Sequence, residues 1–170
     1  GGSDLNSPKL TLNSEGVSAE GNYNYNSSQI RYHTISAIEL ITKQSYRMAT
    51  TSGYGYITDG VSTAVGYVLA PVHLPDGAQM IEISYFLEDD SQNYNFGSLQ
   101  FWKKSSLGST TYSQTTAPTG TYNNKAINLS VNDVIDNVNN SYYIRIASYR
   151  GNNQLKIHGV RLKYSVDKAD

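Results

Sequence analysis

An acidic segment contains the residues best suited to metal chemistry. Glu88, Asp89, Asp90 and Asn93 lie close together in the sequence, and each carries a side-chain oxygen. Calcium prefers hard oxygen ligands of this kind, often on loops. The segment lacks the glycine and the final glutamate of an EF-hand loop. We interpret it either as a solvated turn or as a calcium site on these four residues, and we expect no other cofactor.

Aromatic side chains are the second group that could bind a ligand. The chain has 15 tyrosines and one tryptophan. Sugars present apolar C–H faces that stack on exposed aromatic rings, whose polar ends can hydrogen-bond. Tyr54, Tyr56, Tyr94 and Trp102 fall in or near expected loops, so they are the candidate ligand-binding residues. Tyrosine is also a good strand former, so packing on a pleated sheet is the alternative for each position.

The sequence shows no recognisable catalytic arrangement. His33, His73 and His158 have no histidine or carboxylate partner at metal-ligand spacing along one strand. Residues 60–64 resemble a nucleophile elbow but lack its final glycine. Nothing in the pattern brings two carboxylates to the separation that glycoside hydrolysis requires. We therefore predict that the chain has no catalytic residues and is not an enzyme.

Composition limits the partners and the compartment. The formal net charge is −1, with no long basic block, so a nucleic-acid partner is not expected. The chain has no cysteine, which excludes disulfides and cysteine-based zinc sites. No apolar run approaches the ~20 residues of a membrane-spanning helix, so membrane insertion is not expected. Only 16% of residues are charged, so the polar surface is made largely of neutral groups, as is common in extracellular β-proteins. Because many exported bacterial domains lack cysteine, we expect an extracellular or cell-surface bacterial location.

Alternation of apolar and polar residues predicts strands from Ile30 onward. In the segment 80–87, the odd positions from Ile81 to Leu87 are apolar or aromatic and should face the core. The segments 142–148 and 155–166 alternate in the same way. Further strands are expected at 64–69, 99–103, 110–114 and 125–129, and the segment 37–44 is expected to be either a strand or a short helical turn.

The apolar parity changes inside the C-terminal segment. Apolar residues occupy odd positions up to Ile157 and even positions from Val160 onward. A β-bulge adds one residue to a strand and so restores the inward face, and glycine supports the backbone angles that this requires. The sequence therefore predicts a bulge at His158-Gly159.

Short strands separated by turn signals predict an all-β fold. Pro75-Asp76-Gly77 is one such signal, because proline fixes one backbone angle and glycine permits the next. An antiparallel β-sandwich of jelly-roll type is the first choice, and an immunoglobulin-like sandwich is the alternative. One domain is expected over 29–170. Residues 1–28, rich in Gly, Asn and Ser, are expected to be a linker, a tag remnant or a weak edge strand.

Four segments carry a resemblance to a known group of proteins: IRYHTISA at 30–37, LAPVHLPDGA at 69–78, YIRI at 143–146 and IHGVRLKY at 157–164. Together they resemble bacterial exported or surface β-sandwich head domains, of the kind that follow collagen-like or tail-fibre-like stalks. The similarity covers roughly residues 30–166, and its motifs are structural. The resemblance implies a sandwich that self-associates, for example as a homotrimer.

These observations favour a binding function over a catalytic one. The first interpretation is a non-catalytic interaction or structural module of a secreted or cell-surface bacterial protein, in the form of a self-associating head domain. The alternative is a carbohydrate-binding module with a glycan as its partner, calcium-dependent if the acidic segment binds the metal.

Overall fold

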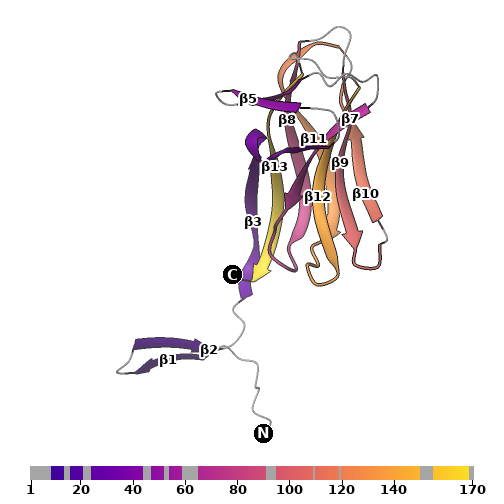
Figure 1. Ribbon diagram of the computed structural model, residues 1–170. Coiled ribbons are helices and arrows are strands. Elements are labelled where there is room, and N and C mark those ends of the chain that lie inside the picture. The colour runs from indigo at the N-terminus through magenta and orange to yellow at the C-terminus, as the bar shows by residue number, and fades with distance from the viewer. Residues whose placement is uncertain are drawn as a thin grey trace.

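Two antiparallel β-sheets form the body of the protein (Figure 1). The computed structural model describes residues 9–13, 16–20, 24–43, 47–51, 54–58, 65–90, 95–108, 110–118, 120–149 and 155–168. The five-stranded sheet has the spatial order β10 (Thr110–Thr116), β9 (Asn95–Ser105), β12 (Asn140–Tyr149), β7 (Val65–Val72) and β4 (Ile41–Lys43). The six-stranded sheet has the order β11 (Tyr122–Val134), β8 (Gln79–Asp89), β13 (Leu155–Lys168), β6 (Tyr54–Thr58) and β5 (Arg47–Thr51), with β3 (Asn24–Ser36) paired to β13.

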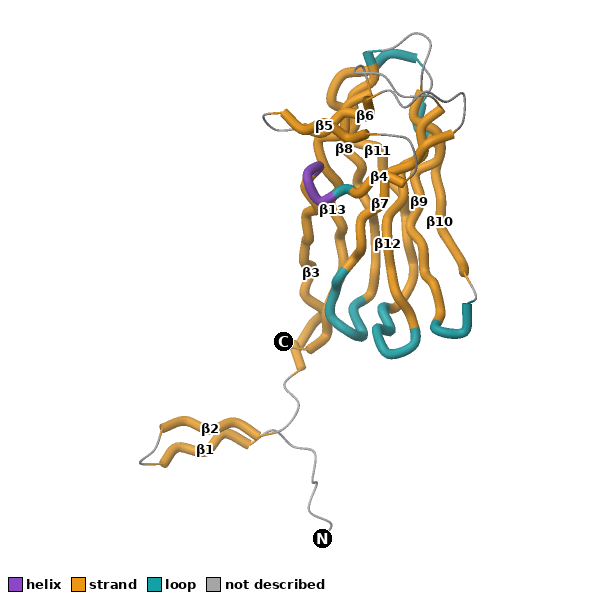
Figure 2. The backbone as a smooth tube through the Cα atoms, viewed as in Figure 1, coloured by secondary structure: helices purple, strands orange, loops and turns teal. Residues whose placement is uncertain are grey.

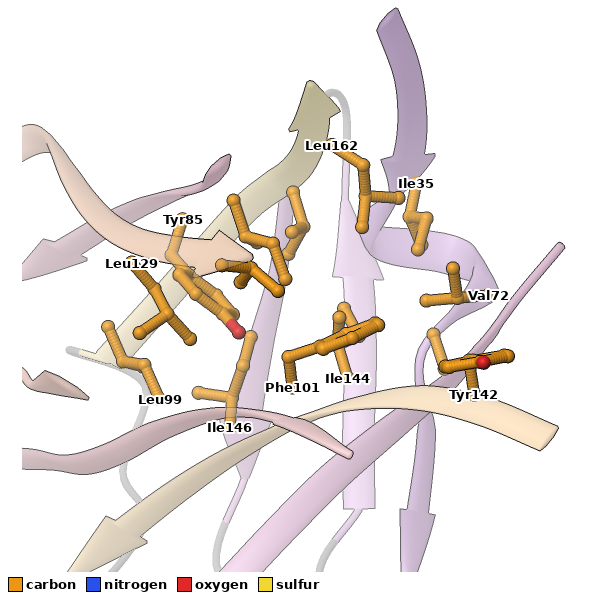
Figure 3. Packing of buried hydrophobic residues seen from close by; sticks show 14 of the residues in the cluster. Ile35, Val72, Tyr85, Leu99, Phe101, Leu129, Tyr142, Ile144, Ile146 and Leu162 are labelled. Carbon is orange, nitrogen blue, oxygen red and sulfur yellow. The ribbon is translucent and has the colours of Figure 1, made fainter. Parts of the chain in front are cut away.

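The sheets lie face to face and enclose one apolar core (Figure 2). Both sheets contribute buried side chains that interdigitate between the layers, among them Tyr85, Leu162, Phe101 and Ile144 (Figure 3). From β7 to β13 the chain repeatedly crosses between the sheets, since β7, β9, β10 and β12 belong to one and β8, β11 and β13 to the other. The predicted antiparallel sandwich is therefore confirmed.

Strand β13 is the central element of the six-stranded sheet. One edge pairs with β8 along most of its length. The other edge pairs first with β6, at Lys156 and Ile157, and then with β3 from Gly159 onward. This C-terminal strand therefore joins the N-terminal strand β3 to the middle of the sheet.

The expected strands agree with those of the structure and extend further at their ends. Segments 80–87, 99–103, 110–114, 125–129 and 142–148 lie within β8, β9, β10, β11 and β12. Residues 65–69 of the segment 64–69 lie in β7, and residue 64 lies outside the described residues. The segment 37–44 contains both alternatives, a 3₁₀ turn η1 (Ala37–Glu39) followed by β4, and residue 44 lies outside the described residues. At Pro75-Asp76-Gly77 the chain does turn, since the Ala78 amide donates to the Pro75 carbonyl and Gly77 has φ +78°.

One core assignment in β8 is wrong. Ile83, Tyr85 and Leu87 are fully buried as predicted, but Ile81 is only partly buried and Met80 takes the inward position. The pairing with β13 shifts by one residue between Glu82 and Met80. An extra residue in a strand reverses the facing of everything beyond it, and the alternation of residue types alone did not reveal this shift.

The N-terminal segment contains more strand than expected. β1 (Lys9–Asn13) and β2 (Gly16–Glu20) pair with each other as a two-stranded sheet of their own. β3 begins at Asn24, before the expected domain boundary at residue 29. Among the described residues there is no helix with the length and apolar character needed to cross a bilayer.

A hydrogen bond between the two sheets lies inside the core. The hydroxyl of Tyr85, on β8, donates to the backbone carbonyl of Gln100, on β9, at 2.9 Å. The Tyr85 side chain is fully buried, and burial raises the pKa of its phenol far above the ordinary value. The phenol therefore keeps its proton at neutral pH and acts as a donor between the layers.

We expect Tyr85→Phe to lower the free energy of unfolding by about 1–2 kcal/mol, because it removes a buried hydrogen bond without leaving a large cavity. Urea unfolding followed by circular dichroism measures this change. Tyr32→Phe is the control, since Tyr32 is 57% exposed and should change stability by less than about 0.5 kcal/mol. Equal effects of the two substitutions would contradict the assignment.

The predicted bulge at His158-Gly159 is confirmed. The pairing of β13 with β8 shifts between Ile157 and Gly159, so one extra residue changes the inward parity at this point. A Cβ atom at Gly159 would lie 3.0 Å from the backbone carbonyl oxygen of Ile35, on the neighbouring strand β3. The bulge thus depends on glycine because a side chain would push two paired strands apart.

Gly159→Ala should lower the free energy of unfolding by about 1–3 kcal/mol, the usual cost of overpacking. The measurement is again a urea titration. Ser165→Ala, farther along the same strand, serves as the control and should stay within about 0.5 kcal/mol of the wild type. If Gly159→Ala left the free energy of unfolding unchanged, β3 would have moved away from the new side chain without cost.

Candidate functional site

An open cleft of about 460 Å³ lies on the outer face of the five-stranded sheet. Its floor and walls come from strands β4, β7, β9 and β12. The lining residues are Ile41, Tyr67, Leu69, Ala70, Pro71, Trp102, Ser141, Tyr142, Tyr143 and Arg145. Most of this set is apolar or aromatic, and the polar groups are few, which is the usual composition of a small-molecule site.

The alternation within each strand determines which side chains reach the cleft. On β12, Tyr142 and Ile144 are buried in the core, so Tyr143 and Arg145 face outward. On β9, the buried Phe101 leaves Trp102 on the outer face. On β7, the buried Val68 and Ala70 place Tyr67 and Leu69 outward in the same way. The aromatic and cationic residues of the cleft therefore face outward from the strands whose alternate residues make the core, and the buried Ala70 and Tyr142 also border the cleft.

Cross-strand register then brings the outward residues together. Trp102 is directly opposite Tyr143, and Arg145 is opposite both Gln100 on one side and Leu69 on the other. The Trp102 and Tyr143 rings stack with their centroids 5.6 Å apart and their planes 12° apart. Paired aromatic rings at this separation stabilise the sheet and also form a rigid apolar surface.

The Arg145 guanidinium lies among the aromatic rings. Its central carbon is 4.2 Å from the centroid of the Tyr67 ring and 5.6 Å from that of Trp102. A guanidinium packs against the faces of aromatic rings through cation–π attraction, while its N–H groups remain at its edge. Arg145 is partly buried in this position.

Gln100 orients both the arginine and the tryptophan. Its side-chain oxygen accepts hydrogen bonds from Trp102 Nε1 at 2.8 Å and from Arg145 Nη1 at 3.2 Å. Its amide nitrogen donates to Gln114 Oε1, on β10, at 3.0 Å. Gln100 is only 6% exposed. A buried amide with both ends hydrogen-bonded has one orientation, so the cleft is organised before any ligand arrives.

The sequence-predicted aromatic residues divide between different places. Trp102 lies in the cleft. Tyr54 and Tyr56 belong to β6, in the other sheet, and their side chains are not among the described ones. Tyr94 lies outside the described residues. The structure therefore does not bring Tyr54 and Tyr56 into the same sheet as Trp102.

Sequence reasoning missed four residues of the site. Tyr67, Gln100, Tyr143 and Arg145 were placed in or next to strands without a role in binding. Their residue types show nothing unusual, and their positions in the chain are far apart. Only the register between β7, β12 and β9 brings them together. The one signal that the sequence offers is that each of these residues occupies an outward-facing position in the alternation of its strand.

The acidic segment continues strand β8 instead of starting a loop. β8 runs through Asp89, so adjacent carboxylates point to opposite faces. Asp89 is fully buried, whereas Glu88 is partly buried and Asp90 is exposed. Within the described part of the chain, no group of three or more His, Asp or Glu residues could hold a metal ion. Asn93 lies outside that part, so the calcium site on these four residues stays a prediction.

Glu88 and Asp90 share the ammonium group of Lys156. Lys156 is directly opposite Glu88 on β13, hydrogen-bonds to its carboxylate, and lies 2.9 Å from the nearest Asp90 oxygen. His158 Nε2 also lies 3.0 Å from Glu88. The hydrogen bonds to Glu88 and Asp90 raise the pKa of Lys156, and the hydrogen bond from Lys156 lowers the pKa of Asp90. These groups form a network of ion pairs and hydrogen bonds across the paired strands β8 and β13, inside the six-stranded sheet.

Known structures share the fold of this chain. No family model and no curated protein sequence matches it. It is similar to the C-terminal family 6 carbohydrate-binding module (CBM6) of LamC, a marine laminarinase from Zobellia galactanivorans, at 15% identity and a TM-score of 0.51, over 78% of this chain and 98% of that one. A family 35 carbohydrate-binding module from Clostridium thermocellum shows 13% identity and a TM-score of 0.45, over 78% and 97% of the two chains. The C-terminal family 22 module of Clostridium thermocellum Xyn10B shows 7% identity and a TM-score of 0.45, over 87% and 96%. The likeness to the CBM6 structure shows that the fold is a two-sheet sandwich of jelly-roll type.

We expect Gln100→Leu to loosen the cleft, because the Trp102 indole and the Arg145 guanidinium both lose their acceptor. The chain has a single tryptophan, so its fluorescence reports on this position alone. Quenching of that fluorescence by acrylamide should be stronger in the variant than in the wild type.

Gln79→Leu is the matched control, since Gln79 hydrogen-bonds to Asn132 within the six-stranded sheet, away from the cleft. It should leave the quenching unchanged. If Gln100→Leu also left the quenching unchanged, the indole would be held by its stacking on Tyr143 and not by the amide.

Proposed function

We propose that this chain is a carbohydrate-binding module and that the cleft over β4, β7, β9 and β12 is its binding site. The observation that carries the proposal is the Trp102–Tyr143 stack, with Tyr67 and Arg145 beside it in an apolar cleft. Sugar rings have apolar C–H faces that pack on aromatic rings and hydroxyl groups that hydrogen-bond to neighbouring polar side chains. The cleft offers both kinds of contact within one organised surface.

The composition of the cleft supports binding without catalysis. Hydrolysis of a glycosidic bond usually needs two carboxyl groups on either side of the bond. None of the described residues that line the cleft is Asp, Glu or His. A cleft that holds a sugar but offers no acid or base in this position suits a binding module.

The fold supports the same proposal. The CBM6 structure that this chain resembles is, by its own name, a carbohydrate-binding domain of a laminarinase. Fold alone does not determine function, so this likeness only adds to the argument from the cleft. By the same analogy we propose a secreted or cell-surface location.

The cleft reverses the order of the two sequence-based interpretations. The self-associating head domain rests on a resemblance of strand segments, and its trimer stays a prediction. The carbohydrate-binding alternative now has a specific group of residues to carry it. Calcium dependence also stays a prediction, which binding measured with and without chelator would test.

Binding to a panel of immobilised polysaccharides is the direct test. We expect the wild-type chain to bind at least one member, and the Trp102 fluorescence to change on binding. Trp102→Ala and Tyr143→Ala should each weaken that binding at least about tenfold, the loss expected for an aromatic residue at the centre of a site.

Tyr32→Ala provides the control for these variants. Tyr32 is an exposed tyrosine beside Arg161 on the opposite sheet, so it reproduces the aromatic–arginine pair away from the cleft. It should bind like the wild type. Failure of the wild type to bind any member, or equal losses for all three variants, would contradict the proposal.

A further inference from the structure

The five-stranded sheet has an unusual charge composition. Its strands contain four cationic residues, Lys43, Lys103, Lys104 and Arg145, and no Asp or Glu. The whole chain has 14 acidic residues and a net charge of −1. The acidic residues therefore lie outside these five strands, and the sheet that carries the cleft is positive within a slightly negative protein.

Arg145 differs from Lys103 and Lys156, which both have carboxylate partners. Lys103 bonds to Asp133 at 2.9 Å, and Lys156 pairs with Glu88 and Asp90. No carboxylate among the described residues lies within salt-bridge distance of Arg145, whose Nη1 donates only to the neutral Gln100 side chain. Arg145 Nε is buried and makes no hydrogen bond to any described residue. The guanidinium is always charged, so a cation stands in an apolar cleft with no opposite charge beside it among the described residues.

An uncompensated cation of this kind favours an anionic ligand. Removing a charge from water is unfavourable unless another charge or strong hydrogen bonds replace the water. The guanidinium edge matches the planar geometry of a carboxylate and the oxygens of a sulfate, and these charge-assisted bonds are roughly twice as strong as neutral ones. A neutral sugar hydroxyl would satisfy one N–H group but would leave the charge unbalanced.

We propose that the cleft binds an acidic saccharide, with the carboxylate or sulfate group of one sugar on Arg145 and a sugar face on the aromatic cluster of Trp102, Tyr143 and Tyr67. This inference rests on the proposed function and narrows it to polysaccharides that carry uronic acids or sulfate esters. The apolar walls at Ile41 and Pro71 suit a sugar ring better than a flexible acidic peptide.

A glycan array with matched acidic and neutral members tests the ligand class. We expect every strong binder to carry a carboxylate or a sulfate. Reduction of the uronic acids of the best binder to neutral sugars, or removal of its sulfate groups, should weaken binding at least about tenfold. Which of the two treatments abolishes binding then identifies the anionic group. Binding of the wild type should also weaken as salt is raised, a measurement that needs no variant.

Arg145→Gln tests the residue. The variant should bind the acidic and the neutralised forms of that glycan equally weakly, and Arg145→Lys should fall between it and the wild type, since lysine keeps the charge but loses the planar fork. Lys104→Gln is the matched control, because Lys104 is an exposed cation on the same sheet that does not line the cleft. It should change affinity by less than about threefold. Circular dichroism confirms that each variant is folded.

The outcomes separate this inference from the proposed function. Binders that are all neutral, with binding lost in Trp102→Ala but kept in Arg145→Gln, would overturn the acidic-saccharide proposal and leave the carbohydrate-binding function standing. Binding to no glycan would overturn both. Tighter binding to a single-stranded oligonucleotide than to any glycan would also overturn the inference, since stacked bases and phosphates suit an aromatic and cationic cleft as well.

Discussion

The hydrogen bond from the buried Tyr85 phenol to the Gln100 carbonyl joins the core of the sandwich to the chemistry of its outer face. The carbonyl belongs to β9 and accepts this hydrogen bond from a donor on the opposite sheet. The side chain of the same residue holds the Trp102 indole and the Arg145 guanidinium. If β9 slipped by one residue, Phe101 would leave the core and Trp102 would leave the cleft. One strand register therefore satisfies both the dry interior and the binding face, and the interior makes any other register unfavourable.

The sequence predicts most of the sandwich because its strands alternate so regularly. Burial of Ile83, Tyr85 and Leu87 follows directly from a two-residue period, and the change of parity at Gly159 is visible as a change from odd to even positions. The shift in strand pairing at Ile81 could not be predicted from the sequence, because Met80 and Ile81 are both apolar and either could occupy the inward position. A bulge is predictable only where the residue types on its two sides differ, and this holds at Gly159 but not at Ile81.

The site is much less predictable, and the reason is geometric. Trp102 was selected for its residue type, but Tyr143, Tyr67 and Arg145 become its neighbours only through the pairing of β9 with β12 and of β12 with β7. Sequence patterns show which face of a strand a residue occupies and do not show which strand lies beside it. The acidic segment illustrates the converse. Glu88, Asp89 and Asp90 are adjacent in sequence, yet the strand separates their side chains and Lys156 pairs with two of them.

The positive charge of the cleft is not explained by the stability of the sandwich. The core consists of apolar side chains from both sheets, and none of its packing requires Arg145 to be charged. Lys103 contributes to the fold through a carboxylate on the opposite sheet and Lys156 through one on the neighbouring strand β8, whereas the described surroundings of Arg145 are rings and one amide. An uncharged residue of similar shape would fill the same space at lower cost in desolvation. A residue that the fold does not need in its charged form, held in one orientation by a buried amide, is positioned for a ligand that brings the opposite charge.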